Sequence, residues 1–342
     1  MGRHLDRALS GAGRAFAGAA LGLLSRLVVL LIVATFVFSL LEMGEGDAVD
    51  AWLAEAGAGD AGLAAALREE FGLSGTLAER FLAYLSRIAT LDLGISAAFG
   101  RPVAEVVAER LPVTLLMMGA ALVATALIGT LLGILAALRA GRLADGAVGA
   151  VASTLNATPG FVVALVGLIV FSVELRWLPV GGLASFPPPE GAAARALDTA
   201  RHLVLPVATL TLTYLALYVR VARAALVETL RADFVRTARA KGVGGMRLLG
   251  RHLMRPALIP LATLFGVQAS AMLGGSVVVE TVFAVPGFGS LAAMAVVQRD
   301  ALLLAGVVLC GAVLVMVANL LVDLLYAVLD PRVRAGAAGR GG

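Results

Sequence analysis

Residues 111–138 read LPVTLLMMGAALVATALIGTLLGILAAL and contain no charged side chain. An α-helix rises about 1.5 Å per residue, so a helix of this length is long enough to cross the roughly 30 Å hydrocarbon core of a bilayer. Lipid offers no partners to backbone N–H and C=O groups, which must therefore pair within a helix or a closed barrel. A barrel would show short segments of alternating hydrophobicity instead. This stretch predicts a membrane-spanning helix.

Five further apolar stretches bring the number of predicted transmembrane helices to about six. A chain that is 60% hydrophobic and 15% charged, with a mean hydropathy of +0.95, has more apolar surface than one soluble core could bury. The predicted fold class is therefore all-α, a polytopic membrane protein. The remaining stretches cover residues 27–41, 146–173, 202–219, 256–279 and 301–322.

The first of these stretches is the shortest, and the sequence leaves its start open. Arg26 either extends its long side chain to the interface or lies inside a helix that begins near Phe16. A cleaved signal peptide is the competing interpretation, but no small-x-small site clearly precedes the acidic stretch after Met43. We expect a retained helix.

The charges of the loops predict the orientation, since six spans put both termini on one side. The N-terminal tail, the 139–145 and 220–255 loops and the C-terminal tail hold 18 basic and 6 acidic residues, a net charge of +12. The other loops hold 9 basic and 17 acidic residues, a net charge of −8. Because loops rich in arginine and lysine stay in the cytoplasm, we expect both termini to be cytoplasmic.

These assignments divide the chain into three parts. Residues 1–26 form a cytoplasmic tail and the start of the first helix, 27–330 the transmembrane domain, and 331–342 a cytoplasmic tail. Within the domain, residues 42–110 are expected to form a small helical cap outside the membrane. The reason is that acidic residues there are mixed with short amphipathic stretches such as Leu77–Ile88.

The sequence gives no basis for several kinds of chemistry. The only cysteine, Cys310, cannot form an intramolecular disulfide, and His4, His202 and His252 have no metal-ligand spacing. No catalytic triad or carboxylate pair can be argued from these residues, so we expect neither an enzyme nor a metal or cofactor site. The net charge of +4 is explained by topology, and no aromatic-interleaved basic stripe indicates nucleic-acid binding.

The cytoplasmic stretch 220–255 is far longer than a connection between neighbouring helices needs to be. Its pattern predicts a helix continuing out of the fourth span, a short helix through Arg236–Lys241, and a return helix into the fifth span. Gly242, Gly244 and Gly245 would stop the short helix. A helix with small residues on one face and arginines on the other could dock into a groove of a cytoplasmic partner. The residues alone fit equally well a basic loop resting on anionic headgroups.

Residues 233–242 read DFVRTARAKG and are followed by His252, Arg255 and the run ALIP at 257–260. This pattern resembles the cytoplasmic coupling motif of ABC-importer permeases, in the form found in the dipeptide, oligopeptide and nickel branch. The resemblance covers most of residues 70–334. Further motifs similar to the branch are HLVLP at 202–206, ETVF at 280–283, PGFG at 286–289, DPRVR at 330–334 and, in the outer cap, DLG at 92–94 with Ser96, GRPV at 100–103 and RLP at 110–112.

The long outer segment between the first two spans is similar to that of the first of the branch's two paired permeases. Two departures bear on the substrate rather than on the class. The run GEGD at 44–47 stands where the family usually has proline-glycine-aspartate, and Pro256 stands where asparagine is more common.

The resemblance implies a fold like that of type I ABC-importer permeases and a set of partners. A second homologous permease subunit would share the translocation path, and two cytoplasmic ATPase subunits would bind ATP with magnesium. An extracytoplasmic solute-binding protein would deliver a peptide or similar small solute. The chain itself, surrounded by lipid in a bacterial or archaeal cytoplasmic membrane, would need no cofactor. Whether the solute is a dipeptide, an oligopeptide or a nickel chelate stays open.

The resemblance also implies roles in ATPase coupling for particular residues. Gly242 would allow a tight turn and close approach, and Ala238 would keep the buried face thin. Arg236, Arg239 and Lys241 would place charge on the rim of the ATPase cleft. The complete set is Asp233, Arg236, Thr237, Ala238, Arg239, Ala240, Lys241 and Gly242.

A second group of residues stands at the outer end of the fifth span, where it is a possible translocation path or outer gate. It consists of Glu280, Phe283, Pro286 and Gly287. An unpaired carboxylate deeper in the membrane would cost roughly 2.5 to 3.5 kcal/mol. Glu280 is equally well interpreted as a cap for the Pro286–Gly287 turn.

Small residues and a proline predict features of individual spans. Gly129 and Gly133 form a small-xxx-small pair in the second span, which indicates close helix packing rather than solute contact. Pro159, with Asn156, is expected to kink the third span, either as a packed bend or as part of a cavity.

Two other function classes compete with an ABC permease. A secondary transporter driven by an ion gradient would place ionisable residues inside the membrane, and the predicted spans contain almost none. The second competing class is a membrane-embedded enzyme. A P-loop needs a Gly-Lys-Ser/Thr run, whereas the only lysine, Lys241, is followed by Gly242, so this chain cannot hydrolyse ATP by that route.

Overall fold

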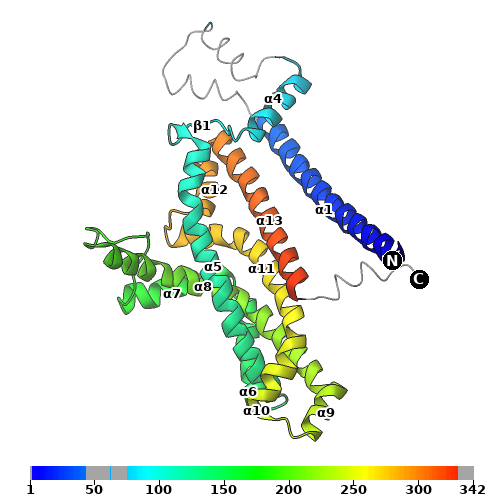
Figure 1. The fold of residues 1–342 in the computed structure, drawn as a ribbon. Helices are drawn as coiled ribbons and strands as arrows, with labels where there is room; N and C mark the ends of the chain where they lie inside the picture. Colours follow the sequence, from blue (N-terminus) through cyan, green and yellow to red (C-terminus); the bar gives the residue numbers. More distant parts are fainter. Residues whose placement is uncertain (1, 44–61, 63–74, 330–342) are drawn as a thin grey trace. The chain divides into compact units, whose positions relative to one another are not determined.

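The computed structural model of the chain describes residues 2–43, 62 and 75–329, which are helical over most of their length (Figure 1). The predicted all-α fold class is confirmed. The motif at 330–334, the tail at 331–342 and much of the predicted cap at 42–110 lie outside the described residues.

Five helices in this part of the chain contain a stretch long and apolar enough to cross a membrane. Most begin or end several residues beyond the predicted apolar stretches, because helices continue past the charge-free segment into the flanking loops. They are α1 (Gly2–Met43), α5 (Val103–Leu138), α8 (Ala192–Arg231), α11 (Met254–Val282) and α13 (Ala301–Leu329). The shorter helices described after residue 230 are α9 (Asp233–Ala240), α10 (Gly245–Leu248), η2 (Leu249–Leu253) and α12 (Phe288–Val297).

The predicted third span, 146–173, is broken. α6 (Leu143–Ala157) is bent by 101° from the continuous pair α7 (Gly160–Gly167) and η1 (Leu168–Glu174). The break falls at Thr158, whose ψ of 123° is extended, because a residue before proline is kept out of the α region. Pro159 also lacks the N–H that would continue the helix. The prediction of about six spans is confirmed as five helices together with this bent pair.

The described residues form two compact units. The first comprises residues up to 112 and residues 290–316, and the second comprises residues 113–289 and the chain from 317.

In the first unit, α4 (Leu77–Ala89) packs against α1. The ring centroid of Phe38 in α1 lies 5.2 Å from that of Phe81 and 5.5 Å from that of Tyr84. The first pair is edge-on and the second is tilted, and aromatic pairs at such distances stabilise beyond the area they bury. The amphipathic stretch predicted at Leu77–Ile88 is thus confirmed as a helix.

A two-stranded hairpin in the first unit is held to the start of α13 by one buried carboxylate. β1 (Ile95–Ser96) pairs antiparallel with β2 (Arg101–Pro102). Asp300 accepts hydrogen bonds from the Ser96 hydroxyl at 2.5 Å and from the Ala98 N–H at 3.0 Å. Because Asp300 is 3% exposed, these bonds offset the cost of burying its charge.

In the second unit, α8 is the central helix and packs against α11, α6 and α7. A Cβ placed on Gly129 would lie 2.8 Å from the Tyr218 ring, and one on Gly133 would lie 2.4 Å from Ala222 Cβ. Only glycine allows α5 to approach α8 this closely. The expectation of close packing at this glycine pair is confirmed.

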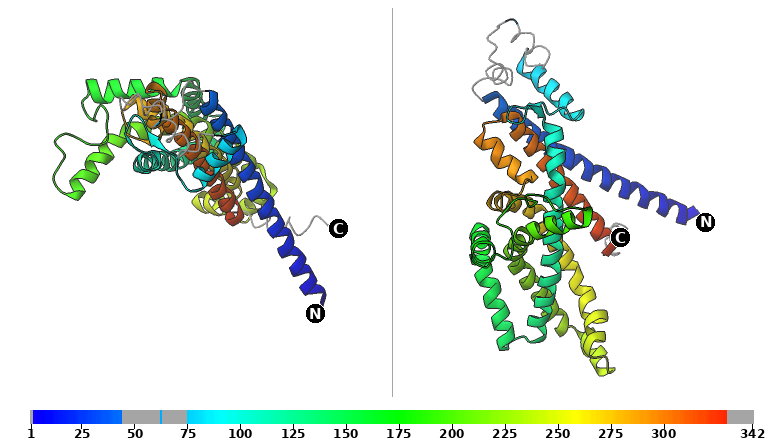
Figure 2. Two further views of the ribbon diagram at one scale, coloured as in Figure 1. Left: turned by 90° about the horizontal axis from the view of Figure 1, so that it is seen from above. Right: turned by 90° about the vertical axis from the view of Figure 1, so that its left-hand side faces the viewer.

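One end of the second unit carries the segment 220–255 that the sequence analysis singled out. In Figures 1 and 2, α9 and α10 lie together at the end of the unit where α8 stops and α11 begins. The predicted order of a continued helix, a short helix and a return helix is confirmed, with a π-helical turn, η2, before α11.

Candidate functional site

The helix α9 is separated from α8 by a sharp corner at one residue. Ala232 has φ −67° and ψ 145°, which is extended rather than helical. Its carbonyl accepts the first hydrogen bonds of α9, from the N–H groups of Val235 and Arg236. Asp233 in the first turn places a negative charge near the positive end of the helix dipole. These features make α9 a helix in its own right.

The other end of α9 is closed by a Schellman motif. The Gly242 N–H donates to the Arg239 carbonyl at 2.9 Å, and the Val243 N–H donates to the Ala238 carbonyl at 3.0 Å. Gly242 has a φ of +80°, which costs a residue with a side chain roughly 1 to 2 kcal/mol. A Cβ at Gly242 would meet nothing within 4 Å. Within this chain, glycine is therefore required by the backbone conformation and not by crowding.

One face of α9 is anchored in the chain's own core. Val235 is 0% exposed and Ala238 is 7% exposed. The structure therefore places Ala238 against the ends of α5, α8 and α11, on the side opposite to the exposed arginines. The buried members of this cluster are Ala137, Leu226, Val235, Ala238, Leu248, Leu253 and Ala257.

The opposite face of α9 is exposed. Helical geometry puts Asp233, Arg236, Thr237 and Ala240 on one outward line, and all four are exposed. Arg236 pairs with Asp233 at 3.4 Å. This surface holds small and charged side chains, which suit it to binding another protein.

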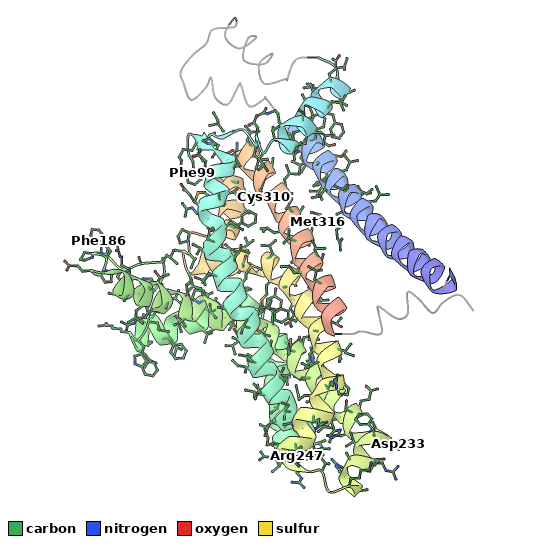
Figure 3. The ribbon with its side chains drawn as sticks, viewed as in Figure 1. Phe99, Phe186, Asp233, Arg247, Cys310 and Met316 are labelled. Atoms are coloured by element: carbon green, nitrogen blue, oxygen red, sulfur yellow. The ribbon has the colours of Figure 1, made fainter. Side chains whose placement is uncertain are left out.

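The outward line is bordered by two further kinds of residue. Lys241 and the half-exposed Phe234 flank it on one side and Arg239 on the other. Figure 3 shows Asp233 and Arg247 at this end of the second unit. The six coupling residues that the sequence implied besides Ala238 and Gly242 are thus all exposed, and they lie on one helix and its cap.

A second cluster surrounds Glu280 at the end of α11. The carboxylate is 0% exposed, and its Oε1 accepts a hydrogen bond from the Thr114 hydroxyl at 2.6 Å. The same hydroxyl accepts from the Phe288 N–H at 2.7 Å. A Cβ on Gly287 would lie 2.4 Å from the carboxylate. The turn after α11 is thereby fastened to α5 through one buried acid.

The four residues predicted as a path or gate lie together at the end of α11, and they differ in how deeply they are buried. Phe283 is 1% exposed and belongs to a hydrophobic cluster of the second unit. Gly287 is buried, and Pro286 is half-buried. Within this chain their geometry matches the turn cap that the sequence left open as the alternative role of Glu280.

The sequence did not reveal the partners of two acidic residues, Glu280 and Asp145. Thr114 lies inside an uncharged stretch, so nothing in its neighbourhood pointed to a carboxylate far along the chain. It likewise did not reveal the pair formed by Asp145 and Arg223, in which Nε and Nη2 donate to the two carboxylate oxygens at 2.5 and 2.7 Å. A single acid beside two arginines in the 139–145 loop was the only available signal.

No metal centre is found in the described ranges, where no group of three or more His, Cys, Asp or Glu side chains could hold an ion.

Comparisons with known proteins agree with one another. The family model described as "binding-protein-dependent transport system inner membrane component" matches residues 129–335. A putative peptide permease protein of Brucella ovis is 37% identical over 313 residues, which cover 91% of this chain and 97% of that protein. A probable peptide ABC transporter permease protein of Sinorhizobium fredii is 34% identical over 312 residues, with the same coverage. The oligopeptide transport system permease protein of Bacillus subtilis is 36% identical over 255 residues, covering 74% and 79%.

A solved structure has a similar fold. It is described as an inward facing conformation of the MetNI methionine ABC transporter, and it matches with a TM-score of 0.54 at 17% identity. The match covers 66% of this chain and 96% of that one.

Proposed function

Because the chain belongs to the family of binding-protein-dependent transport system inner membrane components, it is a multi-pass membrane subunit of an ABC importer, and we propose that α9 is the part that couples it to its ATPases. Its partners include ATPase subunits and a paired permease, and the chain is a transport subunit rather than an enzyme. The ion-gradient alternative has no support from these relatives.

The observation that carries the proposal is the two-sided character of α9. Its inner face, through Val235 and Ala238, is fixed among the ends of three membrane helices. Its outer line of Asp233, Arg236, Thr237 and Ala240 is free to enter a groove of another protein. A force applied to the outer line would therefore be transmitted to α8 and α11.

The proposed cycle follows from this arrangement. ATP with magnesium binds in the two ATPase subunits, and their closure moves α9. The attached ends of α8 and α11 move with it and open the path shared with the paired permease towards the outside. An extracytoplasmic binding protein then releases a peptide or similar small solute into that path. The names of the relatives, which are peptide or oligopeptide permeases, support a peptide as the solute.

The orientation belongs to the same proposal. With both termini in the cytoplasm, α9 faces the compartment that contains ATP. The net charge of +12 in the inner loops against −8 in the outer ones supports this assignment.

The experiment that tests the coupling role uses a change on the outer line of α9. Ala240→Glu would place a bulky charge where the groove must close around a methyl group. We expect the purified importer to lose its ATPase subunits and ATP-driven uptake, while the chain is still inserted in the membrane. Co-purification and uptake into proteoliposomes measure both effects.

The matched control is Ala140→Glu, because Ala140 is an exposed alanine in the 139–145 loop, which carries the same predicted sidedness. It should retain ATPase and uptake. The proposal fails if Ala240→Glu behaves like Ala140→Glu, or if the chain alone transports solute in liposomes without nucleotide.

A further inference from the structure

An apolar groove of about 390 Å³ runs between α5, α8 and α11 in the second unit. This volume falls within the roughly 300 to 1,000 Å³ of ordinary ligand sites. Its floor is formed by Leu261 and Tyr218, which are 2% and 4% exposed, and its rim by Leu127 and Leu131, which are 61% and 65% exposed. Ala126 and Ala262 line the groove, and their small side chains leave it unfilled.

The groove offers little to a polar ligand. Of the side chains that line it, only Tyr218 and Thr130 carry polar atoms. The Tyr218 hydroxyl donates to the Leu261 carbonyl at 3.4 Å and also hydrogen-bonds to Thr130. The polar atoms are thus engaged within the protein, and an occupant would meet hydrocarbon.

One end of the groove is marked by positive charge. Arg255, Leu258 and Ala262 stand at i, i+3 and i+7 of α11 and share a face of the helix, so Arg255 lies one turn beyond the groove on the side of α9. Arg251 is four residues earlier. Both arginines are exposed, and neither has an acidic side chain within 4 Å in the part of the chain that the structure describes.

We propose that this groove is a binding site for an anionic phospholipid, with one acyl chain between α5 and α11 and the phosphate on Arg255 and Arg251. The site lies in the cytoplasmic leaflet under the orientation given in the proposed function, on which this inference rests. That leaflet carries anionic lipids, and basic pockets between helices on that side bind their headgroups.

A helix of the paired permease is the competing occupant. A helix packed into the groove would bring apolar residues beside Arg251 and Arg255, and an unpaired charge buried at an interface is costly. A phospholipid satisfies both ends at once, since its headgroup is anionic and its chain is apolar. Charge complementarity therefore favours the lipid.

The test uses the whole importer reconstituted in vesicles of equal parts phosphatidylcholine and phosphatidylglycerol, with a photoactivatable group on the acyl chain of one lipid. Labelled peptides are mapped by mass spectrometry. We expect phosphatidylglycerol to label the α5 and α11 peptides of the groove, and labelled phosphatidylcholine to do so weakly.

Two variants address the two ends of the site. Arg251→Gln with Arg255→Gln should lower labelling by roughly tenfold or more, because each basic residue near the surface contributes on the order of 1 kcal/mol. Ala262→Phe should lower it by filling the groove. Arg139→Gln removes an exposed charge from the 139–145 loop instead, and Ala147→Phe fills a different apolar groove, between α5, α6 and α8. Labelling should survive both controls.

Equal labelling by the two lipids overturns the proposal, as does labelling that survives both Ala262→Phe and the double arginine variant. A photo-crosslink from a photoactivatable side chain at position 131 to the paired permease, in place of lipid labelling, also overturns it. ATPase co-purification is measured on the same preparations. Loss of lipid labelling with the ATPase retained supports the lipid site by itself, whereas ATPase retained by Ala240→Glu counts against the coupling role alone.

Discussion

Ala238 and Ala240 are two residues apart in α9 and have opposite surroundings. Ala238 is 7% exposed and packs among the ends of α5, α8 and α11, whereas Ala240 is exposed on the outer line. A charge at Ala238 would therefore unfold the local cluster before it could affect a partner. A substitution at Ala240 therefore tests docking to a partner without disturbing the folded cluster around Ala238.

Thr114 is the residue whose hydroxyl connects Glu280 to the backbone of Phe288. Thr114→Val keeps the shape of the side chain but removes the donor to Glu280 and the acceptor for the Phe288 N–H. Leaving a buried donor unsatisfied costs about 1 to 3 kcal/mol. We expect a lower Tm of the purified importer, measured by thermal unfolding in detergent.

Thr114→Ser is the matched control, because it retains the hydroxyl, and its Tm should stay close to that of the natural chain. A Tm of Thr114→Val close to that of the natural chain, with the loss confined to Thr114→Ser, would show that the methyl group and not the hydrogen-bond relay stabilises the turn.

At the scale of elements, α5 and α8 approach through Gly129 and Gly133. In lipid there is no hydrophobic driving force between helices, so their association depends on close packing of this kind. The groove between α5, α8 and α11 begins beside the same contact, since Tyr218 both covers Gly129 and forms part of the groove floor.

Gly133→Leu would push its side chain into Ala222 and the α8 backbone, which lie 2.4 to 3.2 Å from an ideal Cβ. Overpacking of a well-packed contact costs typically about 1 to 3 kcal/mol. We expect reduced thermal stability of the purified importer and weaker ATP-driven uptake. Gly119→Leu, at a helical glycine of α5 with nothing within 4 Å, should have little effect on either. An unchanged Tm for Gly133→Leu would contradict the packing argument.

At the scale of the whole molecule, the orientation can be tested with two exposed positions of the second unit. Lys241 follows α9, and Phe186, which is 97% exposed, lies in the loop between the predicted spans 146–173 and 202–219, which is expected to be outside. Figure 3 shows Phe186 well away from Asp233, the first residue of α9. In a Cys310→Ser background, we expect Lys241→Cys to react with an impermeant maleimide only from the cytoplasmic side. Phe186→Cys should react only from outside.

Labelling is compared between intact spheroplasts and inverted vesicles. Reaction of both cysteines from the same side would refute the orientation and, with it, the cytoplasmic placement of α9.

The sequence by itself determined the helices, the stop of α9 and the family. These features depend on local patterns, namely charge-free stretches, a Schellman glycine and a contiguous motif, which are legible without knowing what lies nearby in space. It also indicated the bend at Pro159, because the restriction that proline imposes acts on the residue beside it.

Only the tertiary structure decided which face of α9 is buried, which hydroxyl donates to Glu280, and where an apolar groove opens one helical turn from Arg255. Thr114 and Glu280 are 166 residues apart in the chain, and the groove needs small side chains on α5 and α11 at one height. The physical reason is that burial and contact depend on how helices pack, and no spacing along one helix specifies the residue that a second helix places opposite it.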